Sequence, residues 1–362
     1  MPQLHSSQIS NIKLSEMQTS IAIYKFAKRS ITITACSLLC CAVSAGAPSV
    51  SMHPHAEATL QEHHLLAPGT DLGMWVWRKE YVADPGEREK LIQFCQKFGI
   101  TRIFVQVRYH KTSDGYLFAE AENWNSLLKE ANAAGIKVEA LDGAGFMGFE
   151  EHRSDTINRL NAILVFNQNQ PDDAKLSGLH YDIEPYVTER WKEGDRQAIA
   201  MELLETMAQI QSTVKASDPS LTVAHDIPFW YSGRDSLKVQ FNGKEKFLDE
   251  HVQDLSDFIG IMSYRTHMTG SNSVSAISQD EVDYAGQNGG KVYLSLESVP
   301  LAETPSITFY NQAPEKLALA IKELSDHMSS EPGFGGIFIH CYRTAGPMLE
   351  AWAEAKEQTA TN

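Results

Sequence analysis

The sequence contains little cysteine: 5 of 362 residues, of which Cys36, Cys40 and Cys41 lie near the N-terminus. Only Cys95 and Cys341 remain in the rest of the chain. A disulfide-stapled scaffold is therefore excluded, and a domain of this length can bury a sufficient core without one. We expect the two remaining cysteines to be buried free thiols.

Basic residues are also scarce: 31 lysines and arginines stand against 46 aspartates and glutamates, giving a formal net charge of −15. Proteins that bind nucleic acid or anionic membrane surfaces usually present an excess of positive charge. The charge thus argues against both kinds of partner. A neutral oligosaccharide or polysaccharide is compatible with it, although charge alone does not select that ligand.

The chain has no run of about 20 apolar residues, the length that a membrane-spanning helix requires. Its most apolar stretch, Ile31–Val43, is shorter, follows several basic residues and precedes small residues through Ala47. This order predicts a secretory signal over residues 1–47, with an uncleaved anchor as the alternative. We expect a secreted or periplasmic protein, with residues 48–70 as a polar linker and no stable membrane span in the mature chain.

No glycine-rich turn follows the first predicted strand, which disfavours an open doubly wound sheet. Strand and helix patterns instead alternate eight times, and this period predicts a single α/β domain, a (β/α)₈ TIM barrel over residues 71–357. The predicted strands are Gly73–Trp77, Arg102–Arg108, Lys137–Asp142, Gly178–Glu184, Thr222–Asp226, Phe258–Tyr264, Lys291–Glu297 and Gly335–Tyr342. The predicted helices include Glu87–Phe98, Trp124–Ala133, Arg196–Lys215, Pro314–Met328 and Ala345–Lys356.

The fourth predicted strand ends in two carboxylates, within Gly178-Leu-His-Tyr-Asp-Ile-Glu-Pro-Tyr186. Strand alternation places His180, Asp182 and Glu184 on one face. Two like charges this close repel, so one acid is expected to keep its proton near neutral pH. A protonated carboxyl is what cleavage of a glycosidic bond needs. A structural ion-pair network at the strand end is the alternative.

Catalytic residues of TIM barrels lie at the C-terminal ends of the strands. Here those ends are rich in aromatic and polar residues, which suit stacking on sugar rings and hydrogen bonding to hydroxyl groups. We predict that a sugar substrate contacts Trp75, Trp77, Gln106, Arg108, Asp142, Asp226, Trp230, Arg265, His340 and Tyr342. Core packing is the alternative for each aromatic residue, and the stronger one for Trp75 alone.

Two mechanisms fit these residues, and both use Glu184 as the general acid. In the first, Glu297 at the end of strand seven is a nucleophile across the barrel, about 5.5 Å away as retaining glycosidases require. In the second, the substrate's own acetamido group attacks, oriented by Asp182 and Tyr264. Glu297 would then bind sugar hydroxyls or hold Arg108 or Arg265.

Two motifs resemble the chitinase-like family 18 glycoside hydrolases. Leu179-His-Tyr-Asp-Ile-Glu184 is similar to the second half of their Asp-x-x-Asp-x-Asp-x-Glu strand, and Met262-Ser-Tyr264 to their Met-x-Tyr. The resemblance implies a (β/α)₈ barrel with Glu184 as proton donor, Asp182 as its partner and Tyr264 as a substrate-positioning hydroxyl. The chain departs from the pattern at Ser177 and His180, which replace two aspartates. Further departures are Arg265, Pro185, His340 and Tyr342.

Two other functions compete with a glycosidase. A metal-dependent hydrolase could draw on His180, Asp182, His225, Asp226 and His340, all near strand ends. No short motif has metal-ligand spacing and strand one offers Trp-Val-Trp, so we expect neither a metal nor another cofactor. A non-catalytic carbohydrate-binding barrel is the second competitor, because a fold does not imply a function.

Overall fold

A computed structural model describes residues 65–360. The predicted signal segment, residues 1–47, and residues 48–64 of the predicted linker lie outside the described residues. The described chain begins in contact with the barrel: Leu65 is buried in the core, and the Ala67 N–H donates to Ser325 Oγ at 2.8 Å.

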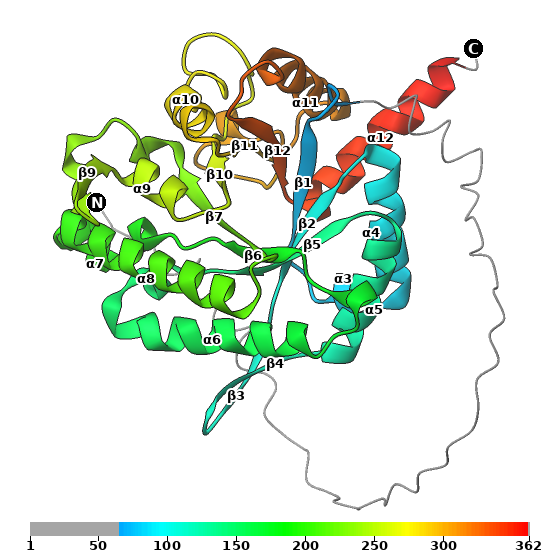
Figure 1. Cartoon of the computed structure of the whole chain (residues 1–362). Helices are drawn as coiled ribbons and strands as arrows, with labels where there is room; N and C mark the ends of the chain where they lie inside the picture. Colours follow the sequence, from blue (N-terminus) through cyan, green and yellow to red (C-terminus); the bar gives the residue numbers. More distant parts are fainter. Residues whose placement is uncertain (1–64, 361–362) are drawn as a thin grey trace, which may run out of the picture. The chain divides into compact units, whose positions relative to one another are not determined.

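Eight parallel strands form a closed barrel, as predicted (Figure 1). They pair in the order β1-β12-β11-β10-β7-β6-β5-β2, and the last closes on the first. Their bounds are β1 Asp71–Val76, β2 Arg102–Gln106, β5 Lys137–Asp142, β6 Gly178–Tyr181, β7 Thr222–Pro228, β10 Phe258–Met262, β11 Val292–Glu297 and β12 Phe334–His340.

Helices connect the strands and surround the barrel. The longer ones are α4 Pro85–Phe98, α5 Ala121–Ala133, α6 Glu150–Gln168, α8 Arg196–Ser217, α9 Leu248–Asp254, α10 Gln279–Asn288, α11 Pro314–Met328 and α12 Tyr342–Ala360. Shorter ones are α3 Glu80–Ala83, α7 Glu189–Glu193, η1 Gly145–Gly148, η2 Asp172–Ala174, η3 Pro185–Val187, η4 Phe229–Tyr231, η5 Asp235–Leu237 and η6 Pro305–Ile307. No helix within residues 65–360 is long and apolar enough to cross a membrane.

Local sequence explains where these helices begin and end. Asp84 accepts hydrogen bonds from two N–H groups of the first turn of α4, and Gly99 ends that helix with a left-handed backbone, φ 67°. Asp195 caps α8 in the same way. The prediction Pro314–Met328 matches α11, whereas α12 begins earlier than predicted.

Two small antiparallel hairpins interrupt the regular alternation, and the sequence reasoning missed both. The first, β3 Tyr109–Thr112 with β4 Gly115–Phe118, follows β2 and projects from the barrel (Figure 1). The second pairs β8 Lys238–Phe241 with β9 Lys244–Phe247.

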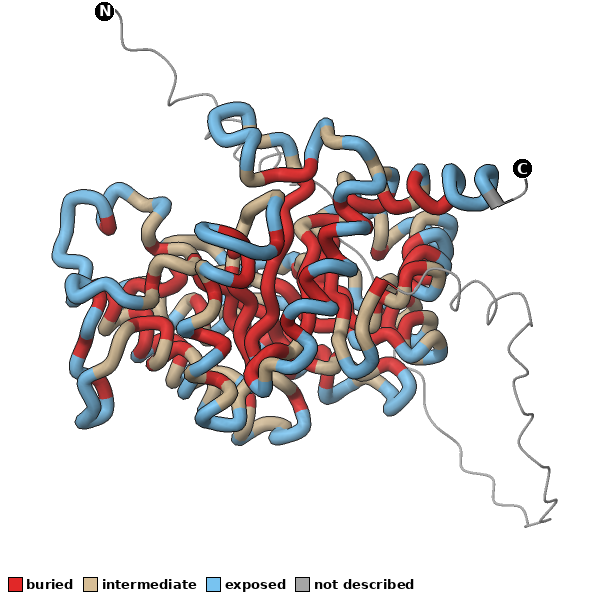
Figure 2. The backbone as a smooth tube through the Cα atoms, turned by 90° about the horizontal axis from the view of Figure 1, so that it is seen from above, coloured by how far each residue is buried: buried red, intermediate tan, exposed pale blue. Residues whose placement is uncertain are grey.

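Buried positions lie along the central strands and the inner faces of the helices, and exposed positions lie around them (Figure 2). One apolar cluster fills the layer between strands and helices, and a smaller one fills the barrel interior. Cys95 and Cys341 are buried free thiols, as expected.

Candidate active site

Strand alternation decides which end residues point into the mouth of the barrel. Trp75, Phe104 and Phe338 form part of the cluster inside the barrel. Two residues further along each of these strands, the same face carries Trp77, Gln106 and His340. By the same period the mouth also receives Asp182, Met262 and Glu297.

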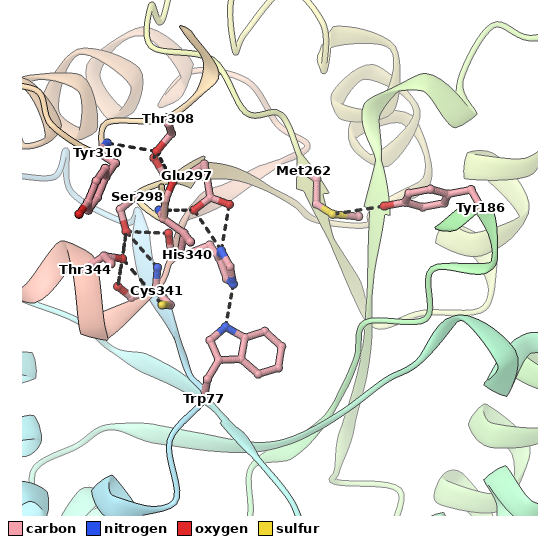
Figure 3. A network of polar contacts seen from close by, with 11 residues as sticks. Trp77, Tyr186, Met262, Glu297, Ser298, Thr308, Tyr310, His340, Cys341 and Thr344 are labelled. Carbon is pink, nitrogen blue, oxygen red and sulfur yellow. Dashed lines mark hydrogen bonds and ion pairs between the residues drawn. The ribbon is translucent and has the colours of Figure 1, made fainter. Parts of the chain in front are cut away.

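Trp77, His340 and Glu297 form one connected unit on one side of this mouth (Figure 3). Trp77 Nε1–H donates to His340 Nε2 at 2.7 Å, and His340 Nδ1 lies 3.1 and 3.0 Å from the two oxygens of Glu297. An indole N–H can only donate, so Nε2 must be the unprotonated nitrogen. His340 is therefore a neutral imidazole that donates its Nδ1–H to Glu297.

Glu297 is almost fully occupied by these contacts. Its side chain is 5% exposed, and Oε1 also accepts the Val299 N–H at 2.6 Å. Its partner is thus His340, and the predicted contacts with Arg108 or Arg265 are wrong. Arg108 is exposed, and Arg265 bonds the Tyr264 carbonyl oxygen and Asn272.

The position of Glu297 in the barrel also differs from the expectation. Strands β6 and β11 are separated by β7 and β10, so they do not face one another across the barrel. The strand opposite β6 is β12, which carries His340.

The two carboxylates of the motif follow β6 instead of ending it. The strand stops at Tyr181, although the Asp182 N–H still donates to the Asp142 carbonyl oxygen at 3.0 Å. Pro185, which has no N–H to continue the ladder, then begins η3. Asp182 and Glu184 are both partly exposed at the mouth.

Two glycines after β5 determine where the acidic segment, residues 182–184, lies. A Cβ on Gly143 would be 2.1 Å from the Asp182 carbonyl oxygen, and one on Gly145 would be 2.7 Å from that of Glu184. Only glycine permits backbones to approach this closely. The Gly143–Gly145 turn is therefore the surface against which the acidic segment packs.

Tyr186 is a site residue that the sequence reasoning missed. Its hydroxyl donates to Glu184 Oε1. The hydroxyl oxygen also lies 3.7 Å from the sulfur of Met262 (Figure 3). Its ring packs edge-on against Trp230, with centroids 5.1 Å apart. Pro185 interrupts the strand pattern, so the sequence alone did not show that the chain turns back and places Tyr186 against Glu184.

Tyr264 lies at the same mouth, with its ring stacked beside that of His340 and centroids 6.5 Å apart. Burial raises the pKa of Tyr264 well above its ordinary value, and the charges of Glu297, Asp182, Asp226 and Glu184 raise it further. The phenol therefore keeps its proton over the physiological range. The three acids predicted to be catalytic, Asp182, Glu184 and Glu297, thus share the mouth with a neutral hydroxyl donor.

An ionic network supports the mouth from within the barrel. It runs from Arg102 to Glu139, then to His180 Nδ1 at 3.1 Å and from His180 Nε2 to Asp226 at 2.8 Å. Burial alone would lower the pKa of His180, but Asp226 and Glu139 outweigh it and raise that pKa to about 9. Asp226, predicted to contact substrate, is 2% exposed and lies beneath the mouth.

The five residues of the metal alternative do not converge. His180 is held between two carboxylates, and His225 lies on the other face of its strand, 3.0 Å from Ser256 Oγ. Burial and the charge of His180 lower the pKa of His225 to about 3. Within residues 65–360 no three His, Cys, Asp or Glu side chains are grouped as metal ligands.

Three of the residues predicted to contact substrate lie elsewhere. Trp75 is 2% exposed, with its ring edge-on to Phe104 and His180, so it offers no stacking face. Tyr342 turns away from the mouth and packs against Tyr81, with centroids 4.9 Å apart. It lines a groove of about 520 Å³ between α4 and α12 on the outside of the barrel.

Asp142 is the third of these residues. Glu139 points into the barrel, and Asp142 lies three residues further along β5, so its side chain points outward. It accepts hydrogen bonds from the Tyr109 hydroxyl at 2.7 Å and from the Gly143 N–H at 2.9 Å. Burial raises the pKa of Asp142, although Tyr109 and Arg159 of α6 partly offset this. Asp142 therefore anchors the β3–β4 hairpin instead of facing the mouth.

The remaining predicted residues stay at or near the strand ends. Trp77 and Gln106 are partly exposed on the interior face, and Trp230 borders the mouth beside Tyr186. Arg265 covers the Phe229 ring at 5.0 Å.

Comparison with known proteins gives the fold and little more. No protein-family model matches the sequence, and no curated protein matches it either. Among solved structures, an exo-β-1,4-mannosidase of Opitutaceae bacterium strain TAV5 is 10% identical with a TM-score of 0.51, covering 75% of this chain and 52% of its own. A family 18 chitinase of Pseudoalteromonas aurantia is 13% identical with a TM-score of 0.48, covering 79% and 99%. A spore cortex-lytic enzyme of Bacillus megaterium QM B1551 is 11% identical with a TM-score of 0.49, covering 80% and 75%.

The mannosidase match, with a TM-score above 0.5, shows a shared fold, and its 10% identity leaves the roles of individual residues open. The chain spans about half of that protein. The barrel that the sequence resemblance implied is confirmed by the closed eight-stranded sheet of the structure itself.

Proposed function

We propose that this protein is an exported glycoside hydrolase that cleaves O-glycosidic bonds next to N-acetylated sugars, with Glu184 as the general acid. The observation that carries the proposal is that Asp182 and Glu184 both follow β6 and are partly exposed at the mouth to which Tyr264 also belongs, its ring stacked beside that of His340 with centroids 6.5 Å apart. A hydroxyl donor and two carboxylates at one mouth are the groups that substrate-assisted cleavage requires. Export rests on the predicted signal segment, residues 1–47.

Each group has a defined step in this reaction. Glu184 gives its proton to the glycosidic oxygen as the C1–O bond breaks, and the leaving sugar departs as an alcohol. The carbonyl oxygen of the substrate's acetamido group attacks C1 and forms a cyclic oxazolinium ion. Asp182 accepts the acetamido N–H, and Tyr264 donates to the acetamido oxygen. The Glu184 carboxylate then takes a proton from water while the water oxygen attacks C1, which restores the acetamido group and the acid.

The state of Glu297 favours this route over a two-carboxylate mechanism. A nucleophile must present an oxygen to the anomeric carbon. Both oxygens of Glu297 face His340 Nδ1, one of them also accepts a backbone N–H, and the side chain is 5% exposed. We therefore assign Glu297 to holding His340, and the attacking group to the substrate.

A matched pair of substrates tests the proposal. Oligomers of N-acetylglucosamine and of glucose with the same linkage differ only in the acetamido group. We expect hydrolysis of the first alone, a loss of about 100-fold or more in Asp182→Asn, and a loss of no more than about 10-fold in Glu297→Gln. Glu193→Gln, an exposed glutamate of α7, is the matched control.

Other outcomes identify the competing functions. Hydrolysis of glucose oligomers that Glu297→Gln abolishes would establish the two-carboxylate mechanism. Binding of the oligomers without turnover would mean a carbohydrate-binding barrel, and activity that a chelator removes would mean a metal-dependent hydrolase.

A further inference from the structure

No strand holds the backbone of Glu184, so the orientation of its carboxyl group depends on contacts of the side chain. It follows β6 by three residues, and its backbone, at φ −114° and ψ 72°, is outside the strand geometry. A carboxyl group on such a segment can rotate unless another side chain restrains it. General-acid catalysis requires the proton to be within hydrogen-bond reach of the leaving oxygen.

Tyr186 supplies that restraint from two residues further along the chain. Its hydroxyl donates to Glu184 Oε1. The carbonyl oxygen is the stronger acceptor of a protonated carboxyl group. With Tyr186 donating to Oε1 as the carbonyl oxygen, the proton of Glu184 is carried by Oε2.

The ring of Tyr186 is itself fixed by packing. It lies edge-on to Trp230 at 5.1 Å and to Tyr231 at 6.2 Å, and its hydroxyl oxygen lies 3.7 Å from Met262 Sδ. Burial raises the pKa of Tyr186 above its ordinary value, and Glu184 adds to this, so the hydroxyl stays a donor. A donor with a rigid ring suits a positioning role.

We propose that Tyr186 is a positioning residue for the reaction: it holds Oε1 of Glu184 so that Oε2–H faces the leaving oxygen. This rests on the proposed function. A positioning role for Tyr186 predicts that the loss of its hydroxyl affects the rate differently for different leaving groups. A sugar alcoholate must be protonated to depart, whereas dinitrophenolate departs without a proton.

The test compares Tyr186→Phe with wild type on two N-acetylglucosaminides, one with a sugar and one with a dinitrophenyl leaving group. Phenylalanine keeps the ring that packs on Trp230, and thermal unfolding checks that the variant is folded. We expect kcat/KM to fall about 10- to 100-fold for the sugar leaving group, as for a lost hydrogen bond to a charged group, because Glu184 becomes a carboxylate as it gives up its proton. For the dinitrophenyl substrate we expect a change of less than about threefold, with KM unchanged for both.

Tyr284→Phe is the matched control, since the Tyr284 hydroxyl also donates to a carboxylate, Asp254 Oδ1 at 2.6 Å, but on the outer helices. An equal loss on both substrates would overturn the inference, and so would a Tyr186→Phe variant as active as the control. If either result is obtained while the wild type is active and Glu184→Gln is inactive, the proposed function still stands. A wild type that hydrolyses neither substrate refutes the proposed function itself.

Discussion

Replacing Gly143 with alanine should displace the acidic segment while leaving its two carboxyl groups chemically unchanged. The added Cβ would lie 2.1 Å from the Asp182 carbonyl oxygen and 2.5 Å from the carbonyl carbon, both of them backbone atoms. Ordinary contact begins at 3.4 Å, so one backbone must move by about 1.3 Å. A misplacement of about 1 Å at a catalytic group can cost about 100-fold in rate. We expect kcat/KM to fall by about that factor, and overpacking to lower the free energy of unfolding by about 1–3 kcal/mol.

Gly290→Ala is the control for this substitution, because a Cβ there meets only atoms at 3.6 Å or more. The assay measures kcat/KM on an N-acetylglucosamine oligomer together with thermal unfolding, so that only folded protein is compared. The reasoning is refuted if Gly143→Ala is as active as Gly290→Ala while remaining folded.

Two buried groups predict how stability changes with pH. The pKa of His180 in the folded protein is raised to about 9. The stabilisation of the fold by its ion pairs with Glu139 and Asp226 is therefore complete below pH 6.5 and is lost as pH rises through 9. The free energy of unfolding should therefore fall by about 3 kcal/mol across that window; denaturant titrations should show a shallower fall in His180→Gln, and an identical fall would contradict this. Burial, with the charge of Glu250, raises the pKa of Asp249 to about 7, so its destabilising effect builds up as pH rises from about 4 and is complete above pH 7. Asp249→Asn should stabilise the protein by about 1–3 kcal/mol at pH 8 and by much less at pH 4; equal effects at both values would rule out this cause.

The period of the sequence predicted the barrel because each strand pattern is short, apolar and separated by a helix. The predicted strands match the eight observed ones to within a few residues at most ends. The fourth was drawn too long: alternation continues in the sequence through Glu184, but the ladder ends with the Asp182 N–H. The first hairpin was missed because Tyr109–Phe118 is polar and weakly alternating, and β4 packs against α6.

The site was only partly predictable, for a geometric reason. Strand parity gives the direction of a side chain inside a strand, and it could have placed Trp75 in the core. It could also have shown that Asp142 points outward, but only if Glu139 had first been known to point into the barrel. Beyond a strand end the direction depends on the loop, which is why Tyr342 was misplaced and Tyr186 was overlooked. Glu297 and His340 are register partners at the ends of consecutive strands, so their contact could have been predicted, whereas Trp77 meets His340 only because β1 pairs with β12 when the barrel closes.

The most direct test of the account is the rate at which Glu184→Gln cleaves an N-acetylglucosamine oligomer, measured beside Glu193→Gln at the same pH. Loss of a general acid removes about 10²- to 10⁴-fold in rate. We expect a loss in that range for Glu184→Gln and an unchanged rate for Glu193→Gln. A Glu184→Gln variant that cleaves the oligomer as fast as wild type would show that Glu184 is not the general acid.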